Sequence, residues 1–139
     1  MSTTIRPELS KKNRYWLERH RFYELKHFCL QYPLWKELYN TIDSLNPKPI
    51  EHMTLSMVKA HGRPTERSAI ARAFLSERMA LVTQNAVRAD PDLARFILEG
   101  VTNGWSYDVL NARLGVPCCK DTYYDRYRRF FWLLSADRQ

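Results

Sequence analysis

Apolar residues recur along the chain at helical spacing, and prolines fall where helices are expected to begin or end. Between residues 11 and 30, apolar side chains follow one another at one or two helical turns, with basic residues between them. Proline is tolerated in the first turn of a helix, because the N–H that it lacks needs no partner there. The spacing predicts helices over about 11–30, 33–45, 64–89, 91–103, 107–114 and 119–135. The predicted fold class is therefore all-α.

Residues 46–63 interrupt this pattern. They contain Pro47, Pro49 and Gly62 and show no sustained apolar period, which is typical of a linker or a long loop. The chain is therefore expected to consist of a basic helical hairpin over 1–45, a linker over 46–63 and a helical core over 64–139.

A short glycine turn separates the last two predicted helices. Ser106 is placed to cap the first of them, and Gly115 is placed to end it in left-handed backbone. Val116 is expected to point into the core before the longer helix begins. Two helices joined in this way are typical of a helix-turn-helix, here over 106–135. In a DNA-binding motif of this kind, the N-terminal residues of the second helix face base edges in the major groove.

The second helix of this motif carries side chains that suit DNA. Arginine binds guanine or phosphate, and threonine and tyrosine hydroxyls contact phosphates. The residues expected to face DNA are Lys120, Thr122, Tyr124, Arg126, Arg128 and Arg129. Two features depart from the common motif: Asn111 stands where a small residue is usual, and the turn is longer. A helical hairpin used only for packing, with the aromatic stripe as its core, is the alternative interpretation.

The charge of the chain is positive and unevenly distributed. The 139 residues include 22 Lys and Arg against 15 Asp and Glu, a formal net charge of +7. Residues 1–63 hold 11 basic and 6 acidic residues, residues 64–104 hold 5 and 5, and residues 105–139 hold 6 and 4. This excess favours a polyanionic partner such as nucleic acid, DNA first and RNA as the alternative.

Cations alternate with aromatic residues in the first predicted helix, which suits phosphate contact and base stacking. The candidate contacts there are Lys11, Lys12, Arg14, Arg19 and Arg21. A solvated amphipathic helix, with lysine and arginine stems lying over apolar surface, is the alternative.

No pattern in the sequence predicts a metal site, a cofactor or an enzyme. Cys118 and Cys119 are adjacent, and neighbouring side chains on a helix diverge by about 100°, so they do not easily share one tetrahedral ion. The glycines are scattered singly, which argues against a phosphate-binding loop. Three cysteines suit a reducing compartment, and the chain shows neither a signal peptide nor an apolar run long enough to cross a bilayer. We therefore expect a cytoplasmic protein without a membrane partner.

Two stretches carry a resemblance. RFYELKHFCLQYPLWK (residues 21–36) and GVPCCKDTYYDRYRRFFWLLS (residues 115–135) resemble segments of short prophage-encoded proteins of Gram-positive bacteria. The C-terminal half is also similar to phage late-gene regulators of the ArpU and RinA kind, whose helix-turn-helix resembles the promoter-reading region of sigma factors. The resemblance implies a phage-encoded transcriptional regulator that binds promoter DNA in the host cell, with RNA polymerase as a candidate partner. Because one motif gives limited base readout, a homodimer is expected.

Two other functions stay open. A small basic phage protein could inhibit a host defence nuclease, as anti-CRISPR proteins do, by placing its basic surfaces in a nucleic-acid channel. It could also be the DNA-recognising small subunit of a packaging terminase, which would require a large ring oligomer.

Overall fold

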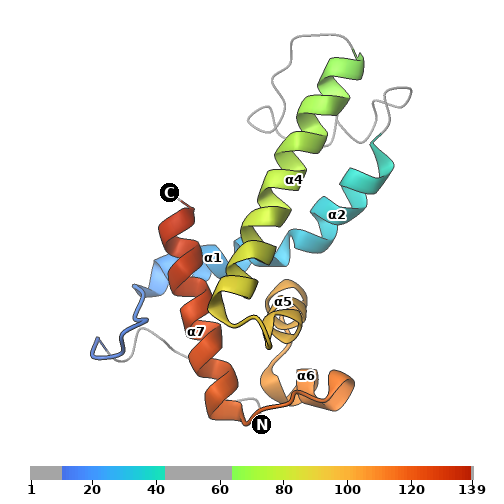
Figure 1. Cartoon of the computed structure of the whole chain (residues 1–139). Coiled ribbons are helices and arrows are strands. Elements are labelled where there is room, and N and C mark those ends of the chain that lie inside the picture. Colours follow the sequence, from blue (N-terminus) through green and yellow to red (C-terminus); the bar gives the residue numbers. More distant parts are fainter. Residues whose placement is uncertain (1–10, 43–63, 139) are drawn as a thin grey trace. The chain divides into compact units, whose positions relative to one another are not determined.

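The computed structural model describes residues 11–42 and 64–138, and every regular element within them is an α-helix (Figure 1). The helices are α1 (Arg19–Leu30), α2 (Tyr32–Thr41), α4 (Pro64–Ala89), α5 (Ala94–Asn103), α6 (Tyr107–Leu114) and α7 (Lys120–Asp137). The predicted all-α class is therefore confirmed for this part of the chain. None of the described helices is both long enough and apolar enough to cross a membrane. The predicted linker over 46–63 lies outside the described residues.

The first helix begins at Arg19, and its predicted start near residue 11 is wrong. Glu18 caps α1, because its carboxylate accepts hydrogen bonds from the backbone N–H groups of His20 (2.9 Å) and Arg21 (3.2 Å). The bond from His20 is the main cause of the lowered pKa of Glu18. Residues 11–18 form turns and loop, where the side chain of Asn13 accepts from the N–H of Tyr15 (2.9 Å). A local polar cap therefore decides the boundary, although the apolar spacing continues upstream of it.

A side-chain carboxylate also sets the start of α5. The carboxylate of Asp90 accepts hydrogen bonds from the N–H groups of Asp92 (2.9 Å) and Leu93 (3.3 Å), so the helix begins at Ala94, later than predicted. At its other end, Gly104 adopts φ 70° and ends α5 as expected. α2 ends at Thr41, and its predicted extension to residue 45 reaches beyond the described residues.

The described chain divides into two compact units. One contains the described residues up to Gln31 together with those from Leu81 onward, and the other lies within Tyr32–Ala80. This division differs from the predicted hairpin over 1–45, because α1 belongs with the C-terminal helices and α2 does not.

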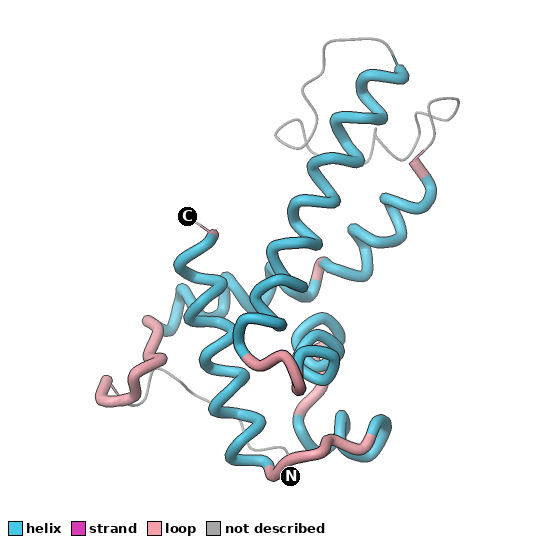
Figure 2. Tube along the Cα trace, viewed as in Figure 1, coloured by secondary structure: helices cyan, strands magenta, loops and turns pink. Residues whose placement is uncertain are grey.

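The core of the larger unit is built on α7. α1 packs against α5 and α7, and α5 packs against α6 and α7; Figure 2 shows the loops that join these helices. The ring of Phe22 on α1 meets that of Phe131 on α7 edge to face, with centroids 5.1 Å apart. Other fully buried side chains of this core are Leu25, Cys29, Ile97, Leu110, Phe130 and Leu134. Burial of each large apolar side chain is worth about 1.5–3 kcal/mol, so the two ends of the described chain stabilise one another.

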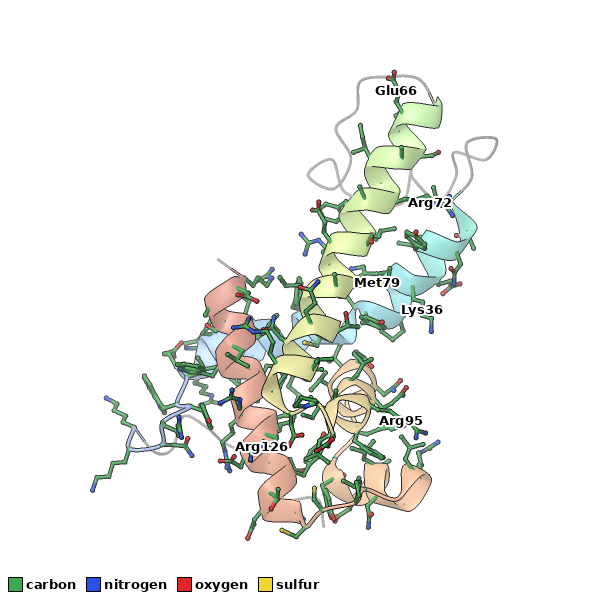
Figure 3. The ribbon with its side chains drawn as sticks, viewed as in Figure 1. Lys36, Glu66, Arg72, Met79, Arg95 and Arg126 are labelled. Atoms are coloured by element: carbon green, nitrogen blue, oxygen red, sulfur yellow. The ribbon has the colours of Figure 1, made fainter. Side chains whose placement is uncertain are left out.

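The smaller unit contains α2 and the part of α4 up to Ala80. Trp35 of α2 is 1% exposed. The guanidinium of Arg78 lies 4.3 Å from the ring centroid of Phe74 and 5.9 Å from that of Trp35. The guanidinium of Arg72, which Figure 3 labels on α4, lies 5.0 Å from the ring centroid of Tyr39. Arg72 and Arg78 thus lie on aromatic rings, where cation–π attraction holds them.

Candidate nucleic-acid interface

The turn between α6 and α7 is held by its own polar groups. The Ser106 hydroxyl accepts a hydrogen bond from the N–H of Val109 (3.4 Å) at the start of α6, as predicted. Gly115 ends α6 at φ 66°, with its N–H donated to the carbonyl of Asn111 (2.9 Å). The side chain of Asn111 also accepts from the N–H of Val116 (2.9 Å), and Val116 is buried as expected. Asn111 therefore has a local purpose: it satisfies a backbone donor that the longer turn leaves without a helical partner.

The first turns of α7 hold three of the predicted DNA contacts. The ammonium of Lys120 lies 3.3 Å from the carboxylate of Asp108 on α6. Thr122 is exposed, with its hydroxyl 3.2 Å from the thiol of Cys119. Tyr124 is only 6% exposed, and its hydroxyl accepts a hydrogen bond from the N–H of Tyr107 (3.0 Å). The expectation that the Tyr124 side chain faces outward is therefore wrong, because α7 uses this ring to hold the start of α6.

The three arginines further along α7 differ in their partners. Arg126 contacts the carboxylates of Asp90 (3.2 Å) and Asp125 (3.0 Å); Figure 3 labels it near the middle of α7. Arg129 donates a hydrogen bond to the hydroxyl of Tyr15 (3.2 Å). Arg128 has no carboxylate partner among the residues that the structure describes. Only Arg128 and Arg129 thus keep an uncompensated charge on this helix.

The cations before α1 and at its first residue lack acidic partners as well. Lys11, Lys12, Arg14 and Arg19 are exposed, and none of them forms a salt bridge within residues 11–42 and 64–138. Three of them lie over aromatic rings: Lys11 over Trp16 (5.9 Å), Arg14 over Tyr15 (4.9 Å) and Arg19 over Tyr23 (5.9 Å). An aromatic ring carries no net charge, so a cation on a ring leaves the local net charge positive, whereas the carboxylate of an ion pair cancels it.

Arg21 has a different position from the other N-terminal cations. Its guanidinium contacts Glu24 (2.9 Å), donates to the hydroxyl and the carbonyl of Ser135 (both 3.1 Å), and reaches the carbonyl of Arg138. These bonds fasten α1 to the end of α7. The predicted role of Arg21 in binding nucleic acid gains no support from this geometry, because its donors are already used within the fold.

Tyr15 joins the N-terminal cations to α7. It is 3% exposed, accepts the hydrogen bond from Arg129, and lies 5.7 Å from the ring of Trp132 with the planes tilted by 59°. Arg128 and Arg129 each neighbour Trp132 on α7, since Trp132 follows them by four and three residues, respectively. This arrangement defines a surface that we call the basic surface: Lys11, Lys12, Arg14, Arg19, Arg128, Arg129 and Trp132.

The two cysteines before α7 differ in their acidity. The pKa of Cys119 is lowered, chiefly by its hydrogen bond with the Thr122 side chain, whereas burial raises the pKa of Cys118. Cys119 is exposed and Cys118 is half-buried, both as free thiols. Within the described residues, no group of three or more histidine, cysteine or acidic side chains is placed to hold a metal ion.

The sequence predicted all six cations of the basic surface but not the aromatic residues that join its two parts. The contact between the N-terminal segment and α7 is made by Tyr15 and Trp132. The only sequence signal for Trp132 was its spacing, three residues after Arg129 and four after Arg128. Nothing local in the sequence links them to Tyr15, which is more than a hundred residues away. No family model matches the chain, and no curated protein or solved structure is significantly similar to it.

Proposed function

We propose that this chain binds DNA through the basic surface and acts as a DNA-binding regulator, with α6 and α7 as its helix-turn-helix. One observation carries the proposal. Arg14 of the N-terminal segment and Arg129 of α7 meet on Tyr15, and none of the six cations of the basic surface is paired with a carboxylate in the described residues. Other basic side chains of the same unit, such as Arg88 and Arg126, do have acidic partners.

Free cations matter because of how proteins gain affinity for DNA. Each phosphate that a protein neutralises releases condensed counterions, and this term supplies much of the binding free energy. A cation already paired with a carboxylate contributes less, since its partner brings a negative charge to the phosphate. The six cations of the basic surface, unpaired within the described residues, therefore contribute to this electrostatic gain, and the N-terminal segment supplies four of them.

The paired cations of α7 are compatible with a second role in reading bases. Lys120 and Asp108 form a pair that is 34% and 54% exposed, respectively. A surface salt bridge of this kind is worth about 0–1 kcal/mol, less than a specific contact to a base, which is worth about 1–3 kcal/mol. Lys120 and Arg126 can therefore exchange their acidic partners for DNA, which supports a reading helix behind an anchoring basic surface.

The test is DNA binding by matched charge variants at several salt concentrations. Lys12→Gln combined with Arg14→Gln removes two cations of the basic surface. For duplex DNA, log Kd against log salt should lose about 0.9 in slope for each phosphate contact removed, so about 1.8 for this variant. Arg95→Gln, at an exposed arginine of α5 outside the basic surface, is the control and should keep the wild-type slope. The proposal is overturned if the wild type binds neither duplex nor single-stranded DNA at low salt, or if both variants lose affinity equally.

A second candidate is inhibition of a host defence nuclease. It is favoured by one observation: acidic residues accompany the predicted reading helix, with Asp121 exposed and Asp108 and Asp125 paired with its cations. Such a helix is less suited to base reading, while the basic surface would still occupy a nucleic-acid channel. Binding without sequence preference, together with loss of nuclease activity on addition of the protein, would favour this candidate. Preference for one promoter fragment over random DNA would favour the regulator.

A further inference from the structure

Trp132 is the one large aromatic residue of α7 that stays open to solvent. It is 42% exposed, while Phe130 and Phe131 beside it are buried. One side of the indole lies against Tyr15, at 5.7 Å and a tilt of 59°. The Tyr15 ring is held in place, because it is buried, its hydroxyl accepts a hydrogen bond from Arg129 (3.2 Å), and the guanidinium of Arg14 lies over it (4.9 Å). The indole is thus backed by a fixed ring and presents its remaining surface outward.

The groups around this ring suit a nucleotide. Arg128 lies one helical turn before Trp132 on the same face of α7, and Arg14 lies on the Tyr15 ring behind it. An exposed indole flanked by uncompensated cations combines a stacking surface with phosphate contacts. Proteins that bind single-stranded nucleic acid use this combination, because every unpaired base has a free face to stack.

The same geometry is poorly suited to the interior of a duplex. In duplex DNA both faces of each base are covered by its neighbours, so an aromatic ring gains a stacking partner only by wedging between base pairs. A wedge must protrude from the surface, whereas Trp132 is more than half buried and rests on Tyr15. An unpaired base can instead move onto the ring.

We propose that Trp132 is a stacking platform for an unpaired base of single-stranded DNA, with Arg128 and Arg14 binding the neighbouring phosphates. The inference rests on the proposed function, since it uses the same basic surface, and it adds an unpaired base to the ligands of that surface. On single-stranded DNA, this stacking adds to the phosphate contacts that the basic surface also makes with a duplex.

The experiment compares the full chain with variants on oligothymidylate and on a duplex of equal phosphate number. Trp132→Leu should weaken binding of the single strand about tenfold, as expected for loss of one stacked base, and change duplex binding less than about twofold. Trp132→Phe keeps a stacking ring and should retain most of the affinity. Trp105→Leu, at a half-exposed tryptophan that Arg113 covers at 4.7 Å, is the matched control and should bind like the wild type.

A second measurement does not depend on the folding of the leucine variant. Oligothymidylate should quench part of the tryptophan emission of the wild type, and this quenching should be lost in Trp132→Phe while binding persists. The inference is overturned if Trp132→Leu weakens strand and duplex equally, if it leaves strand affinity unchanged, or if quenching is the same in Trp132→Phe. Absence of binding to both forms by the wild type would instead overturn the proposed function.

Discussion

Gly100 of α5 lies directly against the hydroxyl of Tyr123, and this contact gives a sharp test of the packing between α5 and α7. A Cβ added at Gly100 would stand 2.3 Å from the Tyr123 oxygen, but 3.6 Å from the nearest ring carbon and from Leu110. Tyr123 is fully buried, and its hydroxyl has no hydrogen-bond partner in the described part of the chain. The phenolic oxygen is therefore the single atom that excludes alanine at position 100.

Two opposing effects set the expected change in the free energy of unfolding for Gly100→Ala. Alanine is favoured over glycine within a helix by about 1 kcal/mol. Overpacking of a buried site costs about 1–3 kcal/mol, because it forces side chains off their rotamers or shifts the backbone. Gly100→Ala should therefore lower the free energy of unfolding by up to about 2 kcal/mol, the difference between these terms.

Removal of the Tyr123 hydroxyl oxygen should reverse the sign of the change in unfolding free energy that Gly100→Ala causes. Tyr123→Phe leaves no unsatisfied buried hydroxyl and is expected to be neutral or stabilising. In the Tyr123→Phe background the new methyl group meets only atoms at ordinary contact distance, so Gly100→Ala should raise the free energy of unfolding by about 0.5–1 kcal/mol through helix propensity. The predicted coupling between the two sites is about 1–3 kcal/mol.

Urea denaturation followed by circular dichroism measures all four proteins of this cycle. Gly104→Ala is the matched control: Gly104 has φ 70°, and only Leu30 lies near its added Cβ, so its cost should be equal in both backgrounds. An equal loss for Gly100→Ala with and without the Tyr123 oxygen would refute the packing described above.

Two further predictions concern the turn before α7. Gly115 is at φ 66° with nothing within 4 Å of an added Cβ, so Gly115→Ala should cost about 1–2 kcal/mol from backbone strain alone, and Gly115→Asn less; equal costs in urea denaturation would contradict this. The Thr122 hydrogen bond lowers the pKa of Cys119, so Thr122→Val should raise that pKa and shift alkylation by iodoacetamide to higher pH, since only the thiolate reacts. An unchanged pH profile, measured by mass spectrometry of the modified peptide, would count against the assigned cause.

Local signals predicted much of the fold, and long-range contacts decided the rest. Ser106, Gly104 and Gly115 act within a turn of their own positions, so the ends of α5 and α6 could be predicted from them. The start of α1 could not, because the cap at Glu18 overrides an apolar period that continues upstream. The pattern also placed Tyr124 on the outside of α7, although a pairing with Tyr107 buries it.

The candidate site was predicted as two separate sets of cations, one in each terminal region. Whether such sets meet depends on tertiary contacts, and here Tyr15 brings Arg14 beside Arg129 and Trp132. The acidic partners of the arginines could not be predicted either, because no spacing rule pairs Arg126 with Asp90, 36 residues away. Charge along the sequence therefore located the cations but did not distinguish those compensated by acids from those left free.

The fastening of α1 to the end of α7 has a consequence for synthesis of the protein. Arg21 bonds to Ser135, 114 residues later, and Phe22 packs on Phe131. During translation, α1 must wait for almost the whole described chain before its apolar face finds this partner, and long-range contacts of this kind form slowly. A nascent chain stopped before α7 would expose the faces of α1 and α5 that α7 covers, and such surfaces make incomplete chains prone to aggregate and to be degraded. Synthesis of α7 thus acts as a checkpoint, since the arginines and the indole that it supplies join the N-terminal segment only once this helix has been made.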